Sequence, residues 1–210
     1  MYTLYHMASQ TLSERVLELV KTRGLARAHD VEAKGIHTQL LTRLVREGKL
    51  ERAARGLYRL PDPDYEITEH HGLVLGAARV PKGVVCLLSA LQFHVVGTQL
   101  PRELWMALPR GVREPALEYP PMHFVHISGE AFTVGIEEHV LEGQTVCIYD
   151  VAKTVVDCFK FRNKIGMDVA LEALNESWRE RKLDLKLVSE YARVCRVWNV
   201  MRPYLEAITA

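Results

Sequence analysis

One stretch near the N-terminus decides the fold of the first part of the chain: GIHTQLLTRLVREGKLERAARGLYRL, residues 35–60. Its first half places apolar side chains at helical spacing, which predicts an amphipathic helix over 36–48 that ends at Gly48. Its second half reads as two short strands around Gly56, which predicts a hairpin. The stretch is therefore expected to form a helix followed by a basic hairpin.

Two further helices are predicted before this stretch. Thr11 or Ser13 can cap a helix whose apolar residues recur at helical spacing up to Gly24. Residues 26–33 predict a short second helix, which stops before Gly35. Three helices and a basic hairpin, in this order, are typical of a winged helix-turn-helix. In that fold the third helix enters the major groove of DNA, and the hairpin lies along the backbone or minor groove.

The charge of the chain is unevenly distributed. Residues 1–60 carry eleven Lys and Arg against six Asp and Glu, a formal charge of +5, whereas the remaining 150 carry sixteen against twenty, or −4. A small basic segment joined to a mildly acidic body indicates a polyanion-binding module attached to a domain that does not touch the polyanion. Charge alone leaves chance asymmetry open as an explanation.

The predicted third helix and hairpin supply the candidate DNA-binding side chains. Polar groups on the helix can meet base edges and phosphates, while cations on the hairpin are placed for phosphates or a narrow minor groove. These candidates are His37, Thr38, Gln39, Thr42, Arg43, Arg46, Lys49, Arg52 and Arg55. The alternative is a solvated face on a protein-docking module. No acidic residue lies between His37 and Arg46, however, and solvated helices normally mix signs.

A proline-rich break follows the hairpin. Residues 61–64 read Pro-Asp-Pro-Asp, and each proline fixes its own φ and disfavours helix at the residue before it. We therefore expect a DNA-binding domain over 1–60, a linker over 61–66 and a second domain over 67–210.

The second domain is expected to place strands first and helices last. Strands are predicted over 83–88, 104–108, 122–127, 132–138 and 145–149, with a proline-punctuated loop over 115–121. Helices are predicted over 67–78, over 90–94 with Ser89 as its cap, over 151–162 with Asp150 as its cap, and over 168–179, 184–197 and 202–208. The predicted fold class is α+β, an N-terminal winged helix-turn-helix followed by a mixed α+β domain with a helical C-terminal layer.

The cysteines indicate a reducing compartment. Cys86, Cys147, Cys158 and Cys195 are widely spaced, form no CxxC pair and have apolar neighbours, as reduced core thiols do. No run approaches the ~20 apolar residues that span a bilayer. The first nine residues also lack the basic and apolar segments of a signal peptide. A cytoplasmic protein with no membrane partner is expected.

Neither a metal site nor a cofactor is predicted. On a strand, His123 and His126 would point to opposite faces and could not easily share a metal. Ser89 and His94 lack the GxSxG turn of a hydrolase nucleophile. The chain also contains no GxGxxG or Walker loop for a nucleotide.

Two carboxylates raise the question of an enzyme. Asp150 and Asp157 are seven residues apart and share a helix face, as catalytic carboxylates can. Asp150 is better explained as a helix cap, and Lys153 has helical spacing for an ion pair with either acid. We expect no enzyme, with a nucleic-acid-processing enzyme that uses these carboxylates as the alternative.

Four segments together resemble a known family. They are GKLERAARGLYRL (48–60), CLLSALQFHVVG (86–97), LWMALPRG (104–111) and IYDVAKTVVDCFKFRNKIGMDVALEAL (148–174). In this order they resemble the AbiEi-type antitoxins of type IV toxin–antitoxin, or abortive infection, systems.

The resemblance implies a repressor and a toxin antagonist in one chain. The winged helix would repress its own operon by binding inverted repeats near the promoter, with self-association of the protein on double-stranded DNA. The C-terminal domain would counteract a nucleotidyltransferase-like toxin encoded alongside. The alternative is a stand-alone winged-helix regulator whose C-terminal domain senses a ligand or a protein partner.

Overall fold

A computed structural model describes residues 11–63, 67–116 and 119–209 of the chain. The chain divides into two compact units, one formed by residues 1–71 with 141–144 and the other by 72–140 with 145–210. Three predictions reach outside the described residues. They are the lack of a signal peptide at residues 1–9, the last three residues of the predicted linker, and residues 117–118 of the predicted proline-rich loop.

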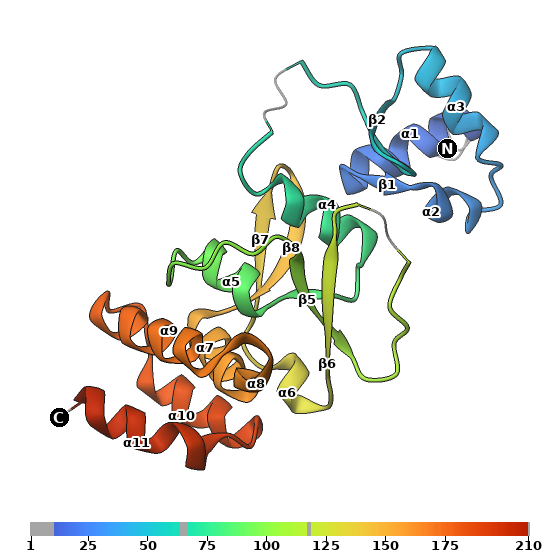
Figure 1. The fold of residues 1–210 in the computed structure, drawn as a ribbon. Coiled ribbons are helices and arrows are strands. Elements are labelled where there is room, and N and C mark those ends of the chain that lie inside the picture. The colour runs from blue at the N-terminus through green and yellow to red at the C-terminus, as the bar shows by residue number, and fades with distance from the viewer. Residues whose placement is uncertain (1–10, 64–66, 117–118, 210) are drawn as a thin grey trace, which may run out of the picture. The chain divides into compact units, whose positions relative to one another are not determined.

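The first unit combines short helices with a small antiparallel sheet (Figure 1). Its helices are α1 (Leu12–Arg23), α2 (Ala28–Glu32) and α3 (Gln39–Arg46), and its strands are β1 (Ala26–Arg27), β2 (Glu51–Ala54) and β3 (Leu57–Arg59). The strand order is β1-β3-β2. Apolar side chains from all three helices form one core, and Tyr58 of β3 belongs to it. Each element is too small to be stable alone, so this shared core holds the unit together.

The start of α1 agrees with the predicted cap at Thr11. The Thr11 hydroxyl accepts a hydrogen bond from the Glu14 amide at 3.2 Å, and the Thr11 amide donates to the Glu14 carboxylate at 2.7 Å. This reciprocal capping box satisfies two backbone donors that no helical carbonyl can reach.

Two boundaries in the first unit differ from the prediction. Residues 26–27 form β1 instead of the start of a helix, because Ala26 pairs with Tyr58 and Arg27 pairs with Leu57 of β3. The third helix begins at Gln39 and not at residue 36, so His37 and Thr38 precede it. Ile36 is buried in the core, and its amide donates to the Val31 carbonyl at 3.3 Å, which holds the chain out of the helix there.

The second unit is built on a five-stranded mixed sheet of order β6-β5-β4-β8-β7. Its strands are β4 (Val84–Val85), β5 (Leu104–Pro109), β6 (Met122–Ile127), β7 (Ile136–Leu141) and β8 (Gln144–Tyr149). Its helices are α4 (His71–Arg79, in this unit from residue 72 on), α5 (Leu87–Phe93), α6 (Glu130–Thr133), α7 (Val151–Lys160), α8 (Arg162–Ile165), α9 (Met167–Arg179), α10 (Leu185–Val194) and α11 (Trp198–Thr209).

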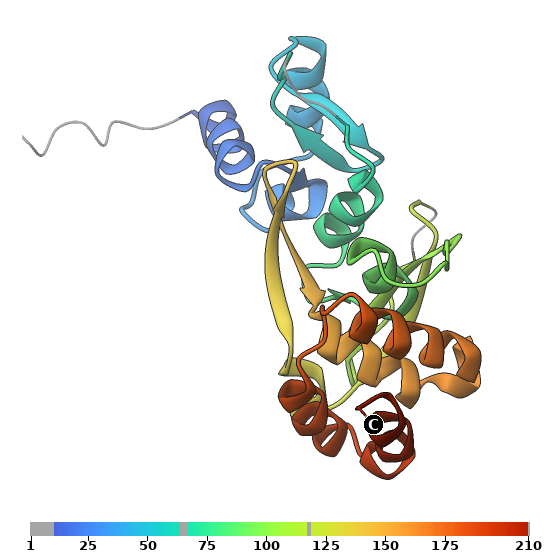
Figure 2. The same cartoon turned by 90° about the vertical axis from the view of Figure 1, so that its left-hand side faces the viewer.

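Helices cover the sheet of the second unit. The largest core joins α5, α7, α9, α10 and α11 to inward side chains of β5, β6 and β8. Figure 1 shows α7, α9, α10 and α11 gathered as one C-terminal layer, and Figure 2 shows the same layer from the side. On α4, a Cβ at Gly76 would collide with the Leu104 side chain, so this glycine allows the helix to approach β5 closely. The structure is thus mixed α+β with two sheets.

Several predicted elements of the second unit have other bounds in the structure. The segment 83–88 is a strand only at Val84–Val85, since α5 already starts at Leu87 with Cys86 as its N-cap. Ser89 therefore lies inside α5 and is not its cap, and its hydroxyl accepts a hydrogen bond from the Trp105 amide at 2.9 Å. The predicted strand 132–138 is divided between α6 and β7, and the last helix starts at Trp198 rather than at residue 202.

Candidate nucleic-acid interface

Helix α3 turns one face into the core and leaves the other open. Leu41 and Leu44 are fully buried, whereas Gln39, Thr42 and Arg43 are exposed. Arg46, in the last turn, is exposed as well, and the first turn contains no acidic residue. The helix is therefore anchored by leucines and carries polar and cationic groups on its free side.

The residues before α3 organise its first turn. Thr38 is the N-cap position, but its side chain makes no capping hydrogen bond. The Nδ1 atom of His37 accepts a hydrogen bond from the Gln39 amide at 3.1 Å instead. His37 thus acts as a local cap, which fixes its imidazole beside the exposed start of the helix.

An open hollow of about 590 Å³ runs along this face of α3. It is lined by Leu12, Ile36, His37, Gln39, Leu40, Thr42, Arg43 and Arg46. Five of the nine candidate DNA-binding residues therefore border one surface hollow. Lys49, Arg52 and Arg55 do not line it, and Thr38 is half-buried beside it.

The two arginines of α3 have different surroundings. Arg43 donates from Nη2 to the Ser13 hydroxyl at 3.0 Å, and its Nε lies 3.5 Å from a Glu47 carboxylate oxygen. Arg46 makes no hydrogen bond or ion pair with any residue that the structure describes. Arg43 is thus held near the helix surface by weak exposed contacts, while the Arg46 guanidinium has no competing partner among the described residues.

Glu47 links the end of α3 to the segment before β2. Its carboxylate lies 2.8 Å from the Lys49 ammonium in addition to its contact with Arg43. The hydrogen bond from Lys49 is the main reason that the pKa of Glu47 lies below its ordinary value. All three side chains are exposed, so water and salt weaken these pairs and a stronger anion can displace Glu47.

The hairpin β2–β3 carries the remaining predicted cations. Arg52 on β2 is exposed, and its guanidinium carbon lies 5.8 Å from the centre of the Tyr58 ring. Arg55 is exposed in the turn, next to Gly56, whose φ of 75° suits a residue without a Cβ. Arg59 pairs with Glu51 across the strands at 2.9 Å. The hairpin therefore carries two exposed cations, Arg52 on β2 and Arg55 in the turn.

Asp30 forms ion pairs within the first unit. Asp30 on α2 pairs with Arg27 through two hydrogen bonds and lies 3.2 Å from Arg23. The hydrogen bond from Arg27 is the largest of the effects that lower the pKa of Asp30 to about 2. Asp30 thus neutralises cations that are not among the DNA-binding candidates.

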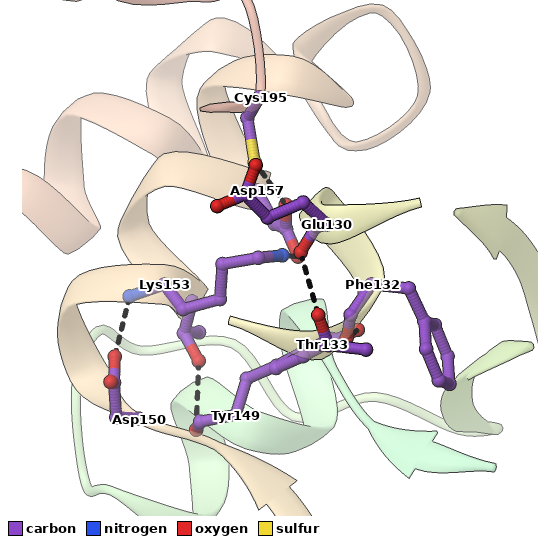
Figure 3. A network of polar contacts seen from close by, with 9 residues as sticks. Glu130, Phe132, Thr133, Tyr149, Asp150, Lys153, Asp157 and Cys195 are labelled. Atoms are coloured by element: carbon purple, nitrogen blue, oxygen red, sulfur yellow. Dashed lines mark hydrogen bonds and ion pairs between the residues drawn. The ribbon is translucent and has the colours of Figure 1, made fainter. Parts of the chain in front are cut away.

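The second unit contains a buried polar network around α7 (Figure 3). Lys153 and Asp157 form an ion pair in which both side chains are fully buried, and the Lys153 ammonium lies 4.0 Å from the centre of the Tyr149 ring. Asp150 caps α7, because its Oδ1 accepts a hydrogen bond from the Lys153 amide at 2.6 Å. Cys195 donates from Sγ to Asp157 at 3.9 Å.

Burial sets the titration behaviour of this network. It raises the pKa values of Asp157, Cys195 and Asp150 above their ordinary ranges. Burial also raises the pKa of Tyr191, whose hydroxyl donates to Asp150 at 3.2 Å, to about 12. Lys153 is paired with Asp157, which leaves Asp150 free to cap the helix.

The other groups considered as chemical candidates make structural contacts. His123 stacks on Trp105 with ring centres 4.0 Å apart, and His126 Nε2 lies 2.9 Å from the Val112 carbonyl. Within the described ranges, no three His, Cys, Asp or Glu side chains gather as metal ligands would. No helix among the described residues is both long and apolar enough to cross a membrane.

Sequence reasoning missed part of the surface at α3. Ser13 and Leu12 of α1 lie beside α3 although they are about thirty positions away in the chain, and no local pattern signals this approach. Glu47 could have been found, because it stands four residues after Arg43 on the same helix.

A family model matches part of the chain. Residues 14–61 match the family model described as "Transcriptional regulator, AbiEi antitoxin". The predicted resemblance to AbiEi-type antitoxins is thereby confirmed over these residues, and the family is one of regulators rather than enzymes.

A likeness of fold extends over more of the chain. The crystal structure of the RV2827C protein from Mycobacterium tuberculosis is similar at a TM-score of 0.53 and 14% sequence identity. The alignment covers 87% of this chain and 71% of that one, and at this identity it shows similarity of fold alone. The chain has no match among curated proteins.

Proposed function

We propose that the protein is a cytoplasmic, non-enzymatic transcriptional repressor that binds double-stranded DNA through a winged helix-turn-helix at residues 1–60. Residues 61–66 are the linker in this proposal, and residues 67–210 form an AbiEi-like C-terminal domain. The observation that carries the proposal is the exposed face of α3, which has no acidic residue before its C-cap Glu47, with a basic hairpin after it.

The element order supports this proposal. In a winged helix-turn-helix, the third helix is inserted into the major groove and the β-hairpin flanks it. Here α3 is the third helix, and β2 and β3 form the hairpin that follows it. The strand β1 completes the small sheet by pairing with β3.

The nine candidate residues have different roles in this proposal. Gln39, Thr42 and Arg46 meet base edges, since they lie on the free face of α3. Lys49, Arg52 and Arg55 contact phosphates and supply affinity that depends on salt. His37 and Thr38 approach the DNA at the start of the helix. Arg43 leaves its ion pair with Glu47 and binds a phosphate or a guanine instead.

Repression follows from occupancy of a promoter-proximal inverted repeat. Such a repeat presents two equivalent half-sites, so two copies of the protein bind it and associate on the DNA. RNA polymerase is then blocked sterically. The family description supports this regulatory role and an antitoxin role. The toxin that the resemblance implies is nucleotidyltransferase-like.

DNA binding is tested by a gel-shift titration of the intact protein against its own upstream DNA at several salt concentrations. We expect binding that is tighter than to random DNA of the same length and that weakens steeply with salt. Equal affinity for both DNAs would contradict a sequence-specific repressor. Saturation of a palindromic site by a single copy would contradict paired binding.

The antitoxin role needs its own experiment. Co-expression with the nucleotidyltransferase-like product of the neighbouring gene is expected to restore growth that this product alone arrests. Growth arrest that persists, together with intact DNA binding, would favour a stand-alone regulator whose C-terminal domain senses a ligand or another partner.

A further inference from the structure

A second hollow, of about 460 Å³, opens in the second unit where the end of β6 meets the C-terminal ends of α7 and α10. It is lined by Ser128, Gly129, Glu130, Ala131, Lys160, Val194, Cys195 and Arg196. This volume lies within the range of pockets that hold small molecules.

Two cations, Lys160 and Arg196, border this hollow. Neither Lys160 nor Arg196 forms an ion pair with another residue in the part of the chain that the structure describes. The Lys160 ammonium lies 6.0 Å from the centre of the Phe161 ring, which is only a weak contact. A guanidinium and an ammonium on one pocket suit a group that carries two negative charges, such as a phosphate.

A carboxylate on the same hollow limits what can bind there. Glu130 is exposed and makes no ion pair within the described ranges, although both cations line the same hollow. Its negative charge repels any anionic ligand, and the repulsion grows with the number of charges that the ligand carries. A polyphosphate or a nucleic acid is therefore a poor occupant, whereas a single phosphate is accepted.

The wall of the hollow is fixed from behind. Cys195 lines it and is bonded through Sγ to Asp157, whose partner Lys153 is fully buried (Figure 3). Arg196 follows directly, with a φ of 60° and its amide bonded to the Arg193 carbonyl at 3.0 Å. The backbone beneath the two cations is thus held in place, whereas the Lys160 and Arg196 side chains themselves become ordered when a ligand binds.

From this arrangement we propose that the hollow is a binding site for a small molecule with a single phosphate group, held by Lys160 and Arg196. Glu130 selects against ligands with further phosphates. The site goes beyond the DNA-binding function and does not depend on it, since all of its residues lie in the second unit.

Calorimetric titration of the intact protein with inorganic phosphate, glycerol 3-phosphate and pyrophosphate tests the proposal, with sodium chloride holding ionic strength constant. We expect saturable binding of the first two and weaker binding of pyrophosphate. Lys160→Gln and Arg196→Asn should each weaken binding about tenfold. Asparagine tolerates the positive φ at this position, so the second variant removes the guanidinium without adding strain.

Two further variants separate a specific site from general charge attraction. Glu130→Gln should tighten phosphate binding about two- to fivefold and remove the discrimination against pyrophosphate. Lys186→Gln deletes an exposed cation on α10 that does not line the hollow, and it should bind phosphate as the unaltered protein does. Tighter binding of glycerol 3-phosphate than of inorganic phosphate would assign a phosphate monoester, and equal binding would assign free phosphate.

The proposal is overturned if neither phosphate compound binds saturably. It is also overturned if Lys160→Gln and Arg196→Asn, checked for an unchanged unfolding midpoint, bind phosphate as tightly as the Lys186→Gln control. Loss of DNA binding in variants of the first unit would not change the phosphate affinity. The DNA-binding proposal and the phosphate-site proposal can therefore be refuted independently.

Discussion

Helices α3 and α7 use charged side chains in opposite ways. On α3, Arg43 and Arg46 are exposed, and only Arg43 has partners among the described residues, Ser13 and Glu47. On α7, Lys153 and Asp157 are fully buried and paired with each other. Exposed cations can still bind an external polyanion, whereas the two buried charges bind each other and cannot be reached by a ligand. The comparison teaches that the location of a charge, more than its presence, separates a binding surface from a structural element.

The largest effect is expected from breaking the buried pair. Lys153→Met leaves Asp157 without a counter-ion inside the core, which should lower the free energy of unfolding by about 3–5 kcal/mol. Urea unfolding measures this change. The double variant Lys153→Met with Asp157→Leu should regain much of the loss, because it buries no unpaired charge. Lys164→Met, which alters a cation outside the buried network, serves as the control and should stay within about 0.5 kcal/mol.

A smaller effect is expected at the ion pairs of Asp30 in the first unit. Asp30→Asn removes the anion that pairs with Arg27 and Arg23, and should cost about 1 kcal/mol once screening by water is allowed for. The pKa of Asp30 is lowered from 3.8 to about 2, so its contribution is complete above pH 3.8 and disappears as the pH falls through 2. Unfolding of both proteins between pH 5 and pH 2 checks this. A difference at pH 2 as large as the difference at pH 5 would contradict the assignment.

The predicted fold and the predicted site depended on different kinds of information. The cap at Thr11, one of two predicted candidates, and the strand β6 depend on local sequence, and the structure has both at predicted positions. The strand β1 has two residues and exists because Ala26 meets Tyr58, which no local pattern reveals. The sequence offered Lys153 two acids at suitable spacing for an ion pair. In the structure Lys153 pairs with Asp157, because Asp150 caps the helix.

The surfaces were harder to predict than the elements. The nine DNA-binding candidates were chosen from one contiguous stretch, so a helical pattern followed by a hairpin pattern was sufficient to propose them. The hollow that contains Glu130, Lys160 and Arg196 draws on three separate elements. Only tertiary packing brings such residues together, and a single sequence carries no signal for it.

The cations of the hairpin should change how DNA binding depends on salt. Arg52→Ala and Arg55→Ala should each reduce the slope of log affinity against log salt by about one, with little change in the preferred sequence. Affinity measured at four or more salt concentrations gives the slope. An unchanged slope, with a changed sequence preference, would instead place these residues against base edges.

The smallest effect is expected when Glu47, which competes with DNA for two cations, loses its charge. Glu47→Gln frees Arg43 and Lys49 from an exposed carboxylate and should tighten DNA binding about two- to threefold. Fluorescence anisotropy resolves a change of this size. Weaker binding would mean that Glu47 positions these cations for DNA rather than competing for them.

The central claim is that α3 enters the DNA groove, and a charge-matched comparison tests it most directly. DNA affinity is measured for Arg43→Ala with Arg46→Ala and for Lys186→Ala with Arg202→Ala, which removes two exposed cations from the second unit instead. We predict a loss of about 1–3 kcal/mol per guanine-reading arginine in the first double variant and almost none in the second. Equal losses in both, or unchanged binding in the first, would contradict the assignment of α3 as the DNA-reading helix.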